Sequence, residues 1–263
     1  YNWLNQMNDL GFGACLADDM GLGKTIQVIT FLEKMYENNK ESHVLLIVPA
    51  SLLGNWSKEI DKFAPRMTYH ILHGKTNILD EDCFATITTY GMALRNEYLQ
   101  ERVWDCLILD EAQAIKNPAT KQTKAIKKIP SKMRIAMTGT PIENDLSNLW
   151  SLFDFLNKGL LGSATDFKNY TKKVQVHPEY ITKLKMMVSP FILRRLKTDK
   201  SIISDLPDKM EITEHVDLSK RQIVLYRKEV EKAEDLILES EGMERRGVVL
   251  GLLTRLKQIC NHP

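Results

Sequence analysis

The chain has 263 residues, of which 43% are hydrophobic and 27% charged, and its formal net charge is +2. These values argue against disordered and fibrous classes and allow one large domain or two modest ones. The longest clean apolar run, Val44–Val48, is too short for a membrane span, which needs about 20 helical residues. The chain begins at Tyr1 rather than at Met, which indicates that the native start lies upstream.

The 4 cysteines show no CxxC spacing, and this fits a reducing, intracellular setting. In the first half, short apolar runs alternate with helical patterns such as Ile26, Ile29 and Leu32. That order predicts an α/β fold in which a parallel sheet is flanked by helices. The expected strands are residues 13–17, 44–48, 69–73, 86–89, 106–110 and 134–138.

From about Asn144 onward the pattern becomes mainly helical. Ser219 with Gln222 reads as a capping box that begins a helix ending near residue 239, and apolar residues from 249 to 259 predict another. Residues 190–193 and 212–216 are expected to be extended. Glycines near residue 160 place a domain boundary there, between a sheet domain over 1–160 and a helical region over 161–263 that can pack on it.

A glycine-rich turn, Gly21-Leu22-Gly23-Lys24-Thr25, follows the first expected strand and precedes an amphipathic helix. In a phosphate-binding loop of this order, backbone N–H groups face phosphate oxygens, the lysine lies near the β and γ phosphates, and the threonine ligates Mg²⁺. The usual GxxxxGK[ST] pattern expects glycine at position 18, where this chain has Asp18. A glycine-rich helix start with an exposed lysine therefore stays an alternative.

Two adjacent carboxylates, Asp110 and Glu111, end the apolar run of residues 106–109. The carboxyl ends of parallel strands are where such sheets bind ligands. Asp110 could hold Mg²⁺, and Glu111 could orient and deprotonate the water that attacks the γ phosphate. A surface turn would also carry such a pair, but the combination with the loop at Lys24 favours a nucleoside triphosphatase.

These blocks resemble the Swi/Snf-type ATPases of helicase superfamily two, in which an acidic pair replaces the first glycine of the loop. The resemblance covers the chain from Leu16 to Arg195 in consistent order. The similar blocks are Leu16-Ala17-Asp18-Asp19-Met20-Gly21-Leu22-Gly23-Lys24-Thr25, Leu46-Ile47-Val48-Pro49-Ala50-Ser51-Leu52-Leu53 with Asn55-Trp56, Thr88-Thr89-Tyr90, Asp110-Glu111-Ala112-Gln113, Met137-Thr138-Gly139-Thr140-Pro141-Ile142-Glu143-Asn144 and Ser189-Pro190-Phe191-Ile192-Leu193-Arg194-Arg195.

The resemblance implies a motor of two RecA-like lobes with ATP between them, of which this chain is the first lobe with its helical insertions and lacks the second. It implies MgATP as cofactor, and double-stranded DNA and the second lobe as partners. The glutamine that reads adenine in the family would lie before Tyr1. The implied site residues are Asp19, Met20, Gly21, Leu22, Gly23, Lys24, Thr25, Asp110 and Gln113 for ATP, Thr25 and Asp110 for Mg²⁺, Glu111 and Lys24 for catalysis, Thr138, Gly139 and Thr140 for coupling, and Pro49, Ala50, Ser51, Thr88, Thr89 and Tyr90 for DNA.

The basic residues gather in two acid-free stretches, 112–142 and 180–198. In a motor that tracks a duplex they would attract phosphates, and the alternative is two solvated faces. The variant Asp-Glu-Ala-Gln is similar to prokaryotic members, for which a cytoplasmic or nucleoid-associated location is expected. We expect slow ATP turnover by this chain alone, because in the family the arginine finger comes from the second lobe.

The leading hypothesis is the ATP-binding lobe of a double-stranded DNA translocase that remodels protein–DNA complexes. An alternative is a nucleotide-dependent interaction module whose helices after residue 160 dock a protein partner. A P-loop kinase or transferase is disfavoured because it would leave the block Thr138-Gly139-Thr140 unexplained. An RNA helicase is a more similar class than a P-loop kinase, but the block at residues 190–195 and the helical insertions favour the Swi/Snf type.

Overall fold

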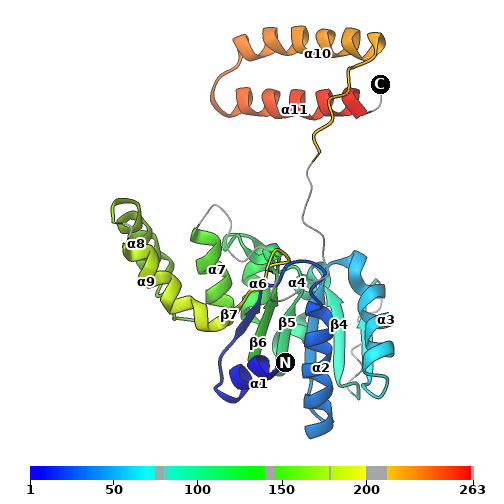
Figure 1. Ribbon diagram of the computed structural model, residues 1–263, viewed down its shortest axis with the longest axis vertical. Coiled ribbons are helices and arrows are strands. Elements are labelled where there is room, and N and C mark those ends of the chain that lie inside the picture. The colour runs from blue at the N-terminus through cyan, green and yellow to red at the C-terminus, as the bar shows by residue number, and fades with distance from the viewer. Residues whose placement is uncertain (75–79, 81, 140–145, 178, 200–211, 262–263) are drawn as a thin grey trace. The chain divides into compact units, whose positions relative to one another are not determined.

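The computed structural model describes residues 1–74, 80, 82–139, 146–177, 179–199 and 212–261. The chain divides into two compact units, Tyr1–Leu206 and Pro207–Pro263. The predicted boundary near residue 160 falls inside the first unit, which holds the helices at Ala164–Val176 and Glu179–Val188 as well as the sheet (Figure 1). Among the helices of the described ranges, none is long and apolar enough to cross a bilayer.

A 7-stranded parallel sheet forms the centre of the first unit, in the order β3-β4-β2-β5-β6-β1-β7. All the strands predicted in the first half are confirmed, with ends shifted by a few residues. The expectation for residues 190–193 is confirmed in part, because a 3-10 turn at Ser189–Phe191 precedes a short edge strand. The strands are β1 Ala14–Leu16, β2 Val44–Val48, β3 Tyr69–Leu72, β4 Ala85–Thr89, β5 Trp104–Leu109, β6 Ser131–Met137 and β7 Ile192–Leu193.

Helices cover both faces of the sheet, which explains why β2 is a continuous apolar run rather than an alternating one. Leu46 and Val48 pack with helices α1 to α3 on one face. Leu45 and Ile47 pack with helices α4 to α7 on the other. The helices of this unit are α1 Asn2–Asp9, α2 Lys24–Asn38, α3 Leu53–Phe63, α4 Tyr90–Arg95, α5 Glu97–Glu101, α6 Lys121–Lys128, α7 Leu146–Leu156, α8 Ala164–Val176 and α9 Glu179–Val188.

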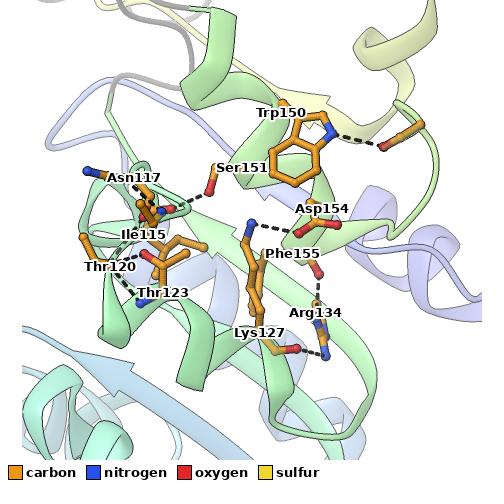
Figure 2. Close-up of polar contacts among 12 residues, drawn as sticks. Ile115, Asn117, Thr120, Thr123, Lys127, Arg134, Trp150, Ser151, Asp154 and Phe155 are labelled. Carbon is orange, nitrogen blue, oxygen red and sulfur yellow. Dashed lines mark hydrogen bonds and ion pairs between the residues drawn. The ribbon is translucent and has the colours of Figure 1, made fainter. Parts of the chain in front are cut away.

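Two cations of the first basic stretch hold α7 to the rest of the first unit (Figure 2). The Arg134 guanidinium, on β6, donates to the carbonyl of Phe155 at 2.9 Å and to that of Lys127 at 3.4 Å. The Lys127 ammonium forms a 2.9 Å ion pair with Asp154 on α7. These contacts lie at the end of the sheet where β6 begins. Packing therefore accounts for part of the positive charge that the sequence suggested for DNA.

Helix α7 also connects the sheet with the two helices after it. Its buried Ser151 donates from Oγ to the carbonyl of Ile115 at 2.7 Å (Figure 2). Trp150 donates from Nε1 to the carbonyl of Gly162 at 3.1 Å, just before α8. The apolar cluster between α7, α8 and α9 comprises Leu149, Phe153, Phe167, Leu184 and Val188.

The second unit is a helical hairpin of α10 Lys220–Glu239 and α11 Gly242–Asn261. The predicted capping box is present, and the Gln222 amide also donates to the carbonyl of Ile259 at 2.9 Å. Residues 212–216 belong to no helix and pair with no strand of the described chain, and the expectation that they are extended stays a prediction. An extended segment forms a strand only where a neighbouring strand supplies its backbone hydrogen bonds.

Candidate nucleotide-binding site

The order of the strands brings the predicted site residues to one edge of the sheet. Strand β6 pairs with β1 on one side and with β5 on the other, and all run in parallel. Their carboxyl ends therefore lie side by side. The phosphate loop, residues 19–25, follows β1, Thr138 and Gly139 follow β6, and Asp110 and Glu111 follow β5.

Two glycines shape the phosphate loop. Gly21 has φ +85° and Gly23 has φ +74°, in the left-handed region that glycine adopts without a steric cost. Gly23 is the N-cap of α2, so Lys24 and Thr25 form its first turn, where backbone N–H groups lack helical partners. The Lys24 ammonium donates to the carbonyl of Asp18 at 2.6 Å. The loop thus offers free N–H groups and a cation, which suit a phosphate chain.

Asp110 is a buried carboxylate with two described donors. Its Oδ2 accepts from Nε1 of Trp56 at 2.8 Å, and its Oδ1 accepts from the N–H of Glu111 at 2.9 Å. Burial raises the pKa of Asp110, and these hydrogen bonds with the Lys24 charge offset only part of that rise. The charge of Lys24 lowers the pKa of Asp110, so the two side chains are close enough to interact electrostatically. Asp110 and the Thr25 hydroxyl are hard oxygen donors of the kind that Mg²⁺ prefers.

Glu111 has φ +51°, and no other non-glycine residue in the described ranges has a positive φ. Such a conformation costs about 1–3 kcal/mol and is often found at functional sites. Its carboxylate accepts from the Gln113 amide, whose Oε1 in turn accepts from Oγ1 of Thr138 at 3.1 Å. This chain of hydrogen bonds joins the turn after β5 to the end of β6.

The residues expected on the DNA side divide into two groups. Residues 49–51 follow β2, and the last two of them are exposed. Thr88, Thr89 and Tyr90 are buried. The hydroxyls of Thr88 and Tyr90 donate to buried backbone carbonyls, and that of Thr89 caps α4. Their hydroxyls are therefore already used inside the fold, and the place of these three residues on the DNA side stays a prediction.

Thr140, the last residue expected to couple nucleotide state to movement, lies outside the described residues. Four further residues lie at or near the site, and the sequence alone assigns them no role there: Trp56, Asp18, Arg195 and Lys197. The side chains of Trp56 and Asp18 are buried beside the loop and the acidic pair. A signal was available for Asp18, because a carboxylate that directly follows a buried strand requires a positive partner.

Comparison with known proteins identifies the family. The SNF2-related domain matches residues 1–263. YwqA of Bacillus subtilis, named as a candidate ATP-dependent helicase/translocase, is 42% identical over 100% of this chain and 30% of its own length. The chromatin-remodeling ATPase INO80 of Vanderwaltozyma polyspora is 34% identical over 100% of this chain and 19% of its own length.

Among solved structures, the Sulfolobus solfataricus SWI2/SNF2 ATPase core in complex with dsDNA gives a TM-score of 0.74 at 46% identity. The alignment covers 100% of this chain and 57% of that one. The chain spans 30% or less of the length of these two curated relatives. The chain belongs to the SNF2-related domain family, and its parallel sheet with flanking helices matches the RecA-like part of a SWI2/SNF2 ATPase core.

Proposed function

We propose that this chain is the ATP-binding lobe of a double-stranded DNA translocase that remodels protein–DNA complexes. The observation that carries the proposal is the meeting of the phosphate loop, the Asp110-Glu111 pair and Thr138 at one sheet edge. The similarity to an ATPase core solved with dsDNA supports the choice of duplex DNA as the partner.

Each residue of the site has a role in this proposal. The N–H groups at the start of α2 and the Lys24 ammonium bind the phosphates, and Thr25 with Asp110 holds Mg²⁺. Bound Mg²⁺ supplies positive charge that offsets the charge of the phosphate oxygens. Glu111 accepts the proton of the attacking water. Gln113 donates to that carboxylate and accepts from Thr138, so protonation of Glu111 changes the hydrogen bonds at the end of β6.

Duplex DNA contacts the lobe at the carboxyl end of β2 in this proposal. Ala50 and Ser51 are exposed there, and a hydroxyl with nearby N–H groups suits phosphate oxygens. Such contacts fix a position on the backbone without reading bases, as a translocase requires. A second lobe supplies an arginine to the γ phosphate. This chain alone therefore hydrolyses ATP about 10³–10⁵ times more slowly than the two lobes together.

The decisive measurement is the ATPase rate of the full-length protein with no nucleic acid, duplex DNA, single-stranded DNA or RNA. We expect duplex DNA to give the largest stimulation. Lys24→Ala should lose nucleotide binding, whereas Glu111→Gln should keep binding and lose turnover. Normal hydrolysis by Glu111→Gln would show that Glu111 is not the catalytic base. Equal rates under all four conditions would contradict the proposal of a DNA-dependent motor.

A nucleotide-dependent interaction module without motor activity gives a different result. The translocase should bind duplex DNA with an affinity that falls with salt, with a slope of about −0.9 per neutralised phosphate. An interaction module should show no such slope. Adding the second lobe in trans should restore ATPase activity to this chain only if the chain is part of a motor.

A further inference from the structure

Asp18, two residues after the end of β1, occupies the position at which the usual phosphate loop has glycine. Its side chain is 0% exposed. Oδ1 accepts from the backbone N–H of Arg195 at 2.9 Å and from its Nε at 3.1 Å, while Oδ2 accepts from Nη2 of Arg195 and from the Gln27 amide at 3.1 Å. Burial raises the pKa of Asp18, but these donors outweigh it and hold the pKa below its ordinary value. Arg195 is therefore the counter-ion of a buried carboxylate.

The backbone around Arg195 runs alongside the first residues of the loop. The Ala17 N–H donates to the carbonyl of Leu193 at 2.7 Å, and the Asp19 N–H donates to that of Arg195 at 3.0 Å. In the other direction, the N–H of Lys197 donates to Oδ2 of Asp19 at 2.9 Å. The pairing of β1 with β7 thus continues past both strands and attaches residues 193–197 to the loop.

Lys197 brings a further positive charge to the same place. A Cβ built on Gly21 would lie 3.1 Å from the Lys197 Nζ and 3.4 Å from its Cε. The ammonium therefore lies against the glycine whose φ of +85° bends the loop. Among the described residues no carboxylate forms an ion pair with this ammonium.

We propose that residues 193–197 complete the phosphate-binding site: Arg195 is a positioning residue that balances the charge of Asp18, and Lys197 binds the triphosphate beside Gly21. The proposal rests on the nucleotide site proposed above. A carboxylate at position 18 would repel a triphosphate, and without Arg195 it would keep the Gln27 amide but have no counter-ion. The arginine lets an acidic residue occupy the position of the missing glycine.

Lys197→Ala in the full-length protein tests the binding role, with Arg194→Ala as the matched control. Arg194 is the exposed neighbour on the same segment. We expect Lys197→Ala to weaken MgATP binding about tenfold or more in isothermal titration calorimetry, because a charge-assisted contact is lost. The melting temperature should stay unchanged, and Arg194→Ala should bind as the wild type does. MgATP affinity of Lys197→Ala within twofold of the wild type would overturn this role.

A double-mutant cycle tests the positioning role. Arg195→Leu should lower both the melting temperature and MgATP affinity, the latter about tenfold, because the Asp18 charge is left unpaired. Adding Asp18→Asn removes that charge, so the double variant should recover ATP affinity to within about threefold of the wild type. Recovery of the melting temperature without recovery of ATP affinity would show that the unpaired Asp18 charge does not cause the loss of affinity, and would overturn the positioning role of Arg195.

Lys24→Ala separates failure of this inference from failure of the proposed function. If Lys24→Ala binds MgATP normally, the nucleotide site itself is misplaced. If Lys24→Ala loses binding while Lys197→Ala and Arg195→Leu keep it, the site stands and only the role of residues 193–197 is overturned.

Discussion

Trp56→Phe should destabilise the protein through the hydrogen bond that Trp56 donates to Asp110. Both partners are buried, and Nε1 lies 2.8 Å from Oδ2. A hydrogen bond to a charged group contributes about 1.5–3 kcal/mol, against about 1 kcal/mol for a neutral pair. Trp104→Phe is a matched control, because Trp104 is equally buried and donates to the neutral carbonyl of Leu99 at 3.1 Å. Trp56→Phe should therefore cost about 0.5–2 kcal/mol more than Trp104→Phe at neutral pH.

The pH dependence provides a stricter test of the same prediction. Burial raises the pKa of Asp110, so keeping this carboxyl ionised in the folded protein lowers the free energy of unfolding. This destabilisation is absent below about pH 4, where the carboxyl is protonated even in the unfolded chain. It appears as the pH rises through the raised pKa. Trp56 reduces that cost in the wild type. The excess penalty of Trp56→Phe should therefore be full at neutral pH and shrink as the pH falls through the raised pKa. Urea unfolding without Mg²⁺, followed by circular dichroism, measures it. The reasoning would be refuted if Trp56→Phe and Trp104→Phe cost the same stability at neutral pH, or if the difference between them stayed constant down to pH 4.

The remaining predictions concern packing and backbone strain. Gly13→Ala should lower the free energy of unfolding by about 3 kcal/mol, because the new Cβ would stand 2.4 Å from the carbonyl oxygen of Leu156. Ser151→Ala should cost about 1–3 kcal/mol, since it leaves the Ile115 carbonyl without its 2.7 Å donor. Glu111→Gly should raise stability by about 1 kcal/mol by relieving the φ of +51°, while ATPase activity of the full-length protein is lost. Urea titrations check all three free energies.

Matched controls accompany these variants. Gly54→Ala, on α3 with open space around it, should stabilise slightly rather than destabilise. Ser57→Ala removes an exposed hydrogen bond and should change stability by less than about 0.5 kcal/mol. Glu111→Gln keeps the Cβ and should not gain stability. Equal effects in a variant and its control would show that the named contact or strain is not the cause.

The sheet was predictable because inner strands such as β2 and β5 are buried along most of their length and read as apolar runs bounded by turns. The residues at its carboxyl edge followed from that prediction, since parallel strands present their loops together. The buried positions of Thr88 and Tyr90 were not predictable, because hydroxyls in a short motif look the same whether they face a duplex or a backbone carbonyl.

The glycines near residue 160 close local turns, and α7 packs against both the sheet and α8–α9, so both sides of the expected boundary lie in one compact unit. The pairing of Arg195 with Asp18 could not be predicted from the sequence, for a different reason. The two residues are 177 positions apart, and local patterns carry no information on such a contact. The block that contains Arg195 was noticed only as a resemblance, without a physical role.

The short strand β7 limits where this protein can be truncated. It is the outermost strand beside β1, and its two residues lie beyond α9 in the chain. A truncation at residue 160 would strip β7 away and expose the backbone of β1 as an open edge, which invites aggregation. Expression trials of a minimal lobe should therefore extend past residue 199.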